Sequence, residues 1–208
     1  MADFKTYYEK LEKMQGWIKD DLTRSTVYGK ANFLVAMGIF NYLEILGSFY
    51  SNKKTPKERF KSVFYDLLPK DKNNRYKNIY DKLEKLTRYK DEKNKPRGGA
   101  YDCLRCGLTH EYLVKTYLRN KNVKAKISFT IYGVDNSASF AINISSRDCG
   151  LELVKLSKNE YHLRIFNPRL IRDLYVAFEN FKKIIRNNKD KRKIFIERAK
   201  EIGLDELE

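Results

Sequence analysis

Residues 33–50 read FLVAMGIFNYLEILGSFY, a stretch in which apolar side chains occupy almost every position. A helix that is apolar nearly all round belongs in the interior of a protein, so the stretch predicts the central helix of a bundle. Asn41 and Glu44 interrupt it with an amide and a charge. Because these polar residues lie in the middle of the stretch, we expect a buried helix and no membrane segment.

Amphipathic helices are expected on both sides of this stretch. Apolar residues recur at three- and four-residue spacing over residues 3–24, 55–68, 73–88 and 99–118, and in two further helices after Pro168. Ser25 or Thr26 can cap the central helix. Thr55-Pro56-x-Glu58 has the pattern of a capping box with proline in the first helical turn. The pattern therefore predicts a mainly α fold.

The apolar period changes between residues 125 and 166. Apolar and polar residues alternate there, as expected for strands, around Ile127–Ile131, Phe140–Ile144, Leu151–Leu153 and Tyr161–Ile165. Segments rich in Gly, Asn, Asp and Ser separate these runs. We therefore expect one domain over residues 1–208, with a small antiparallel β-meander at 125–166 inserted between the helix at 99–118 and the C-terminal helices.

Lysine and arginine number 43 against 27 acidic residues, which gives a net charge of +16. Such a surplus attracts polyanions, although a lysine-rich composition also arises from genome-wide bias. The polar segment RYKDEKNKPRGG at 88–99 reads as a mobile loop, and we expect it to contact nucleic acid through Arg88, Lys93, Lys95 and Arg97. The basic tail at 182–200 could be an RNA-binding face, but we favour a solvated helix surface with Lys189, Lys191, Arg192 and Lys193 pointing outward.

Three cysteines are too few for a secreted disulfide framework, and the first residues lack the apolar run of a signal peptide, so we expect a cytoplasmic protein. Cys103, Cys106 and His110 share one helical face, and Cys149 could complete a zinc site. Without a second C-x-x-C pair, buried thiols and no metal or cofactor are the better interpretation. P-loop, G-x-G-x-x-G, H-E-x-x-H and acid-cluster signatures are absent from the sequence, which disfavours nucleotide hydrolysis and metal-dependent nuclease chemistry.

The segment YDCLRCGLTHEYL at 101–113 holds Arg105 and His110, and His110 is one of only two histidines. Histidine transfers protons near neutral pH, and a guanidinium that is always charged is suited to binding phosphate. This pair therefore predicts phosphate chemistry.

Written as Arg105-x4-His110-x-Tyr112, the segment resembles the signature of the HEPN superfamily (higher eukaryotes and prokaryotes nucleotide-binding), and most closely the toxins of HEPN and minimal-nucleotidyltransferase pairs. The resemblance implies a helical bundle that dimerises across a shared cleft, an antitoxin protein as a partner, and metal-independent cleavage of RNA in a toxin or phage-defence context. It also implies a supporting role for Tyr112, which can be a modification site.

The expected reaction follows from elementary chemistry. His110 would remove the proton of an RNA 2'-hydroxyl, and Arg105 would stabilise the charge that develops on the attacked phosphate, leaving a 2',3'-cyclic phosphate. Two alternatives remain open: a non-catalytic HEPN-fold module that binds RNA or protein, and a structural protein whose charge is only compositional.

The spacing of the pair imposes a geometric condition. At about 100° per residue, side chains five positions apart on a regular α-helix diverge by about 140°. Arg105 and His110 therefore need a distorted turn near Gly107, or groups from two subunits, to act on one phosphate. We further expect Asp102 to hold Arg105 from one turn earlier, and Asn41 and Glu44 to line the same cleft.

Overall fold

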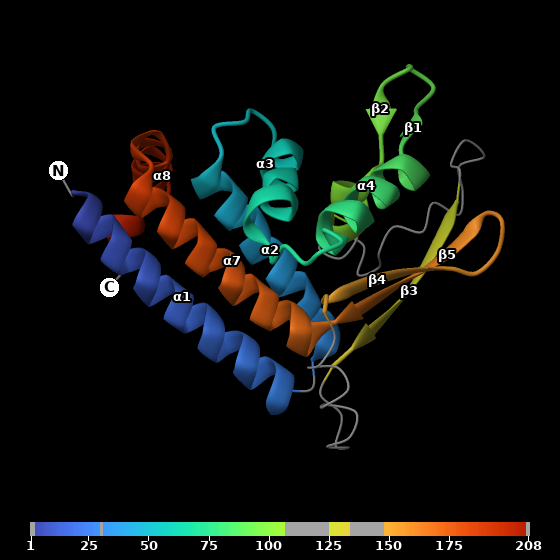
Figure 1. Ribbon diagram of the computed structural model, residues 1–208, viewed down its shortest axis with the longest axis horizontal. Helices are drawn as coiled ribbons and strands as arrows, with labels where there is room; N and C mark the ends of the chain where they lie inside the picture. The colour runs from blue at the N-terminus through green and yellow to red at the C-terminus, as the bar shows by residue number, and fades with distance from the viewer. Residues whose placement is uncertain (1–2, 30, 107–124, 134–147, 207–208) are drawn as a thin grey trace.

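The stretch at 33–50 forms helix α2 (Asn32–Tyr50), around which the other helices pack (Figure 1). The computed structural model describes residues 3–29, 31–106, 125–133 and 148–206. Helices α1 (Phe4–Val27), α3 (Pro56–Ser62), α7 (Asn167–Asn187) and α8 (Lys189–Glu201) all contact α2. Ile39, Phe40 and Leu43 are completely buried between them. The expectation of a mainly helical fold is confirmed.

One strip of α2 stays open. Leu34 and Ile45 are exposed although both are large and apolar, and they lie about three turns apart, which puts them on the same face of the helix. Asn41 lies between them on that face and is half-buried. By length and composition α2 could also cross a membrane, but half of it is buried within the protein, as in a core helix.

The remaining helices follow the caps that the sequence supplies, with one exception. Thr55 and Glu58 form the expected capping box at the start of α3, which continues into the π-helical segment η1 (Val63–Leu67). Helix α4 (Arg75–Thr87) follows. The cap expected from Ser25 or Thr26 is wrong: α1 extends through both residues, and the Thr26 hydroxyl donates to the Leu22 carbonyl. Helix α2 instead begins after Ala31, without a side-chain cap.

The β insertion is a mixed sheet in the order β3-β5-β4, made of β3 (Lys126–Tyr132), β4 (Leu151–Lys155) and β5 (Glu160–Phe166). Strand β5 pairs antiparallel with β4 but parallel with β3, so the expected antiparallel meander is wrong for the described strands. The strands do alternate in direction along the chain. However, β5 lies between its two predecessors, and alternating polarity in a sequence does not specify strand order. The strand expected at 140–144 lies outside the described residues.

The segment expected to be a mobile loop is a short β-hairpin, formed by β1 (Tyr89–Lys90) and β2 (Pro96–Arg97). The Asp91 carboxylate organises its turn by accepting the backbone N–H groups of Lys93 and Lys95 at 3.0 and 2.8 Å. These bonds to the backbone, the one to Lys95 first, lower the pKa of Asp91. The expectation of a mobile loop came from the glycine and proline residues of the segment. Hydrogen bonds from the Asp91 side chain to the backbone of its own turn instead hold the segment in one conformation.

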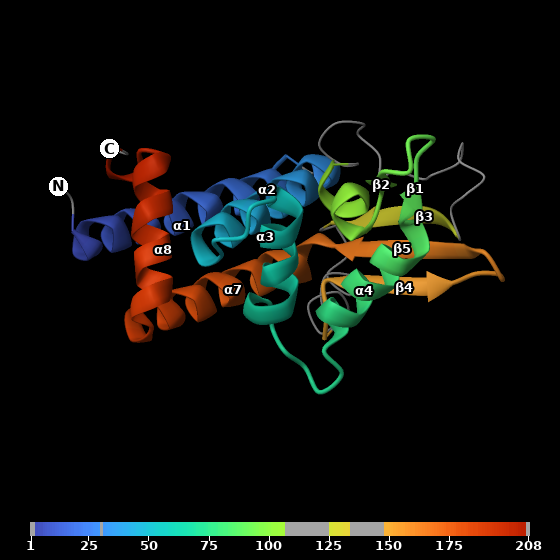
Figure 2. The same cartoon turned by 90° about the horizontal axis from the view of Figure 1, so that it is seen from above.

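A buried polar cluster joins the bundle to the sheet. The Tyr76 hydroxyl on α4 donates to the Asp173 carboxylate on α7 and accepts the Gly150 N–H, 2.8 Å away, just before β4. Arg169 donates to both Asp173 oxygens, at 2.9 and 3.0 Å. A Cβ on Gly150 would lie 2.7 Å from Leu170 Cα, so only glycine lets β4 approach α7 this closely. Figure 2 shows the sheet extending from this end of α7.

The crossing of α2 and α3 depends on Gly47. A Cβ at this position would lie 2.5 Å from the Arg59 carbonyl oxygen, a backbone atom that cannot move aside without shifting α3. We expect Gly47→Ala to lower the free energy of unfolding by about 1–3 kcal/mol in urea titrations, as overpacking does in other cores.

Gly16 on α1 is the matched control, because a Cβ there would meet nothing within 4 Å. Gly16→Ala should stabilise the protein by about 0.5–1 kcal/mol through helix propensity. Equal stability of Gly47→Ala and the wild type would show that the two helices do not depend on this close approach.

Candidate functional site

The helix that carries Arg105 is held at its first turn by side chains from two other helices. Gly98 and Gly99 have φ values of 71° and 102°, a region that glycine adopts readily and other residues rarely adopt. The Glu84 carboxylate on α4 then accepts the Ala100 N–H at 2.9 Å. Lys57 on α3 pairs with Glu84 at 2.9 Å and donates to the Gly98 carbonyl at 3.1 Å. Groups from α3 and α4 therefore fix where this helix begins.

The described part of this helix is not a regular α-helix. After Ala100 and Tyr101, residues Asp102–Cys106 form the π-helical segment η2. A π-helix closes its hydrogen bonds between residues five apart, which brings side chains at that spacing closer to one face than an α-helix does. The sequence prediction of a helix at 99–118 is therefore described only as far as Cys106. His110 and Tyr112 lie outside the described residues.

An ion pair with Glu44 on α2 holds the Arg105 guanidinium. About a fifth of each side chain is exposed. The Tyr101 hydroxyl donates to the second oxygen of Glu44 at 3.2 Å. Burial, reinforced by the nearby Glu44 carboxylate, raises the pKa of Tyr101 and keeps this hydroxyl protonated as a donor. One carboxylate from the central helix thus binds two side chains of the Arg105 helix.

This ion pair lines a pocket of about 350 Å³. The pocket is bounded by residues from four elements: Asn41, Glu44, Ile45 and Ser48 from α2, Arg59 from α3, Arg105 from η2, and Arg198, Glu201 and Ile202 at the end of α8. Arg198 pairs with Glu201. We call this the arginine pocket.

Arg59 differs from the other two guanidinium groups of the arginine pocket. It donates to the Lys53 and Lys54 carbonyls at 3.3 and 3.4 Å, and within the described part of the chain no carboxylate pairs with it. Among the described residues that line the pocket, three arginines face two carboxylates, Glu44 and Glu201, so these side chains together carry one excess positive charge. Such a pocket can hold one phosphate group between guanidinium donors.

Three of the residues singled out from the sequence thus meet: Arg105, Glu44 and Asn41 line the same pocket. Asp102 lies instead beside Cys106. Burial of the Cys106 thiol raises its pKa most, and the negative charge of the Asp102 carboxylate raises it further. The carboxylate paired with Arg105 comes from Glu44 on a different helix. Sequence reasoning did not find Arg59 or Arg198, because nothing local marks two arginines from distant helices as neighbours.

The basic residues expected to contact nucleic acid lie away from this pocket. All four are exposed on or beside the β1–β2 hairpin, toward the opposite end of the molecule from α8 (Figures 1 and 2). Arg88 pairs with Glu84 at 3.4 Å and Arg97 with Asp91 at 2.9 Å, whereas the Lys93 and Lys95 side chains are exposed. The charges of these two lysines are therefore the most accessible of the set.

The expectation for the tail helix is wrong at two of its four cations. Lys191 donates to the Tyr50 carbonyl at 3.0 Å and lies over the Tyr50 ring, and burial lowers the pKa of its ammonium. Arg192 donates to the Ile185 carbonyl at 3.0 Å, near the end of α7. Both side chains dock α8 onto the bundle, whereas Lys189 and Lys193 are exposed.

The cysteines are free thiols. Burial raises the pKa of Cys103 to about 12 and that of Cys149 to about 11, so both stay protonated at neutral pH. Cys103 lies on η2 and Cys149 beside β4. No group of three metal-ligating side chains gathers among the residues that the structure describes.

Comparison with known proteins adds no relative: no family model, curated protein or solved structure matches the chain.

The Glu44–Arg105 pair should contribute to stability because both groups are mostly shielded from water. We expect Glu44→Gln to lower the free energy of unfolding by about 2 kcal/mol, since it removes a charged partner of the mostly buried guanidinium. Urea titrations would measure the change.

Glu9→Gln provides the control for this variant. Glu9 forms a 3.9 Å pair with Lys5 on the surface of α1, where the two side chains are 62% and 82% exposed. Its loss should cost less than about 0.5 kcal/mol. Similar effects for Glu44→Gln and Glu9→Gln would contradict a structural role for the buried pair.

Proposed function

We propose that this protein is a metal-independent endoribonuclease of the HEPN type that binds the scissile phosphate of RNA in the arginine pocket. The observation that carries the proposal is the pocket itself. Arg105, the arginine of the R-x4-H motif, is positioned there by Glu44, and Arg59 adds a guanidinium that no carboxylate neutralises in the described chain.

In the proposed reaction the two arginines have different tasks. Arg59 attracts the phosphate, and Arg105, held in place by Glu44, stabilises the charge that develops when the 2'-hydroxyl attacks. His110 removes the hydroxyl proton and the leaving 5'-oxygen takes up a proton, so the products are a 2',3'-cyclic phosphate and a 5'-hydroxyl. This route needs no metal ion.

A dimer is part of the proposal. Ile45 and Ile202 lie at the arginine pocket and are 36% and 58% exposed, so two large apolar side chains are available for contact at its edge. A second copy of the chain would cover them and bring a second arginine pocket close to the first. An antitoxin protein covering the same residues would block access of RNA.

A non-catalytic RNA-binding module is the second candidate. The net charge of +16 and the exposed lysines of the β1–β2 hairpin favour it, because both support binding without chemistry.

Cleavage distinguishes the two candidates. We expect the wild-type protein to cut mixed RNA in the presence of EDTA, and His110→Ala to slow cleavage at least about 100-fold, the range in which general acid–base groups contribute. Gel analysis of end-labelled RNA would measure both rates and identify the cyclic phosphate end.

His162→Ala is the matched control, because it removes the only other histidine. That ring lies on β5 and bonds the hydroxyls of Ser128 and Thr130 at 2.7 and 3.0 Å. His162→Ala should leave the cleavage rate within about twofold of wild type. That change is far smaller than the loss of about 100-fold or more that follows removal of a general base. Undetectable cleavage by the wild type, or equal loss in both variants, would favour the binding module.

The role of Arg59 is tested by RNA affinity. Arg59→Gln should weaken binding of single-stranded RNA and lower the slope of log affinity against log salt by about 0.7, the value for one lost phosphate contact. Lys19→Gln removes the same charge from an exposed site on α1 and should leave the slope unchanged. An unchanged slope in Arg59→Gln would remove this residue from the phosphate site.

A further inference from the structure

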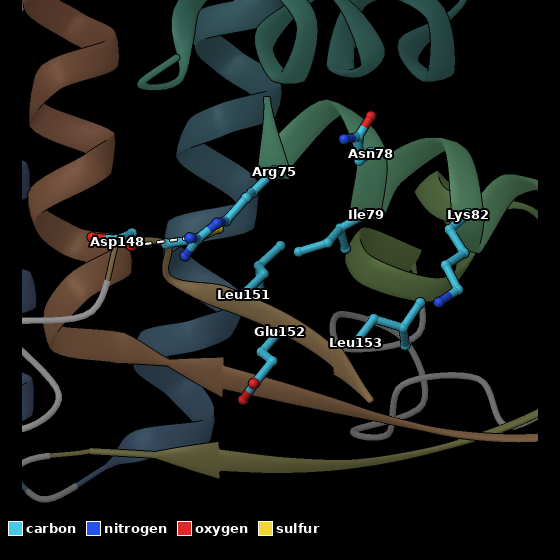
Figure 3. Close-up of a pocket in the computed structure, with 9 residues that line it drawn as sticks. Arg75, Asn78, Ile79, Lys82, Asp148, Leu151, Glu152 and Leu153 are labelled. Atoms are coloured by element: carbon cyan, nitrogen blue, oxygen red, sulfur yellow. Dashed lines mark ion pairs between the residues drawn. The ribbon is translucent and has the colours of Figure 1, made fainter. Parts of the chain in front are cut away.

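A second pocket, of about 520 Å³, lies between α4 and β4 (Figure 3). It shares none of its residues with the arginine pocket. Its volume is within the range of about 300–1,000 Å³ that is typical of small-molecule sites. We call it the α4–β4 pocket.

The α4–β4 pocket has an apolar floor. Leu151 and Leu153 occupy alternate positions of β4, so both side chains lie on the face of the sheet that meets α4, where Ile79 faces them (Figure 3). Leu151 is buried, whereas Leu153 and Ile79 are only partly buried. The partly exposed side chains of Leu153 and Ile79 can therefore still bury apolar surface away from water when a ligand covers them.

The two cations of the α4–β4 pocket are not equivalent. Arg75 is already held by two carboxylates, Asp71 at 2.9 Å and Asp148 at 3.0 Å. Lys82 lies two turns further along α4 and points toward Leu153 (Figure 3). Its ammonium is 4.9 Å from the centre of the Tyr161 ring, and in the described chain no carboxylate pairs with it. One positive charge is thus left at the apolar end of the pocket.

We propose that the α4–β4 pocket binds a small apolar monoanion, a carboxylate on an aromatic or branched aliphatic body. The body covers Leu151, Leu153 and Ile79, and the carboxylate pairs with Lys82. A monoanion fits better than a phosphate ester, because Lys82 is the one cation among the described lining residues without a carboxylate partner, whereas Asp71 and Asp148 already hold Arg75. Cys149 lines it as a protonated, buried thiol, so the site binds without a nucleophile.

The probe for this site is anilinonaphthalene sulfonate, an aromatic monoanion whose fluorescence rises in apolar surroundings. Titration of the full-length protein should give saturable binding, and Lys82→Met should weaken it about fivefold, the upper range for one partly exposed ion pair. Indole acetate should displace the dye from the wild type. Lys82 is exposed, so its replacement should not impair folding.

Lys77→Met is the matched control. Lys77 is on the same helix and also lies over a tyrosine ring, that of Tyr65 at 5.1 Å, but it does not line the pocket. Its replacement should leave dye affinity unchanged. Equal affinity in Lys82→Met and wild type, equal loss in both variants, or displacement by adenosine monophosphate but not by indole acetate would each overturn the proposal.

Discussion

Burial of half of α2 within the protein imposes a condition on the charged side chain that the helix carries. A charge taken out of water must be paired, and Glu44 meets this condition by binding Arg105 and Tyr101 from a helix more than fifty residues later in the chain. The same carboxylate that would otherwise destabilise the central helix therefore determines where the arginine of the motif lies. Asn41 is uncharged and half-buried, and it lies on the same face of α2 as the exposed Leu34 and Ile45.

The charges that line the arginine pocket are balanced to different extents. Glu44 neutralises much of the charge of Arg105, and Glu201 does the same for Arg198. Arg59 donates only to neutral carbonyl groups among the described residues, so its charge is not neutralised. An incoming phosphate would meet Arg59 first and would then compete with Glu44 for Arg105, which ties binding strength to the geometry of one ion pair.

Local signals in the sequence predicted most of the helices and strands. They did not predict which segments lie beside one another in the fold. The apolar run at 33–50, the capping box at Thr55–Glu58 and the alternation at 161–165 each involve residues close in the chain, and each element formed as expected. The order of the strands and the position of Arg59 depend on contacts between segments far apart in the chain. The turn at 91–95 depends on the Asp91 side chain binding its own backbone. Asn41 and Glu44 were found because a polar residue in an apolar helix is itself a local signal of a tertiary contact.

The π-helical segment η2 contains Arg105, the first residue of the five-residue spacing noted in the sequence. Both π-helical segments of the described chain, η1 and η2, pack against α2, and in η1 the bond from the Leu68 N–H to the Val63 carbonyl spans five residues at 2.9 Å. A π-turn is rarer than an α-turn and persists only where its surroundings hold it. At η2 Glu84 fixes the start of the helix, buried Cys103 and Leu104 fix one face, and Glu44 fixes Arg105 on the other. Three different contacts therefore hold the start and two faces of this segment, and the chain keeps π-helical winding over Asp102–Cys106 in place of regular α-helical geometry.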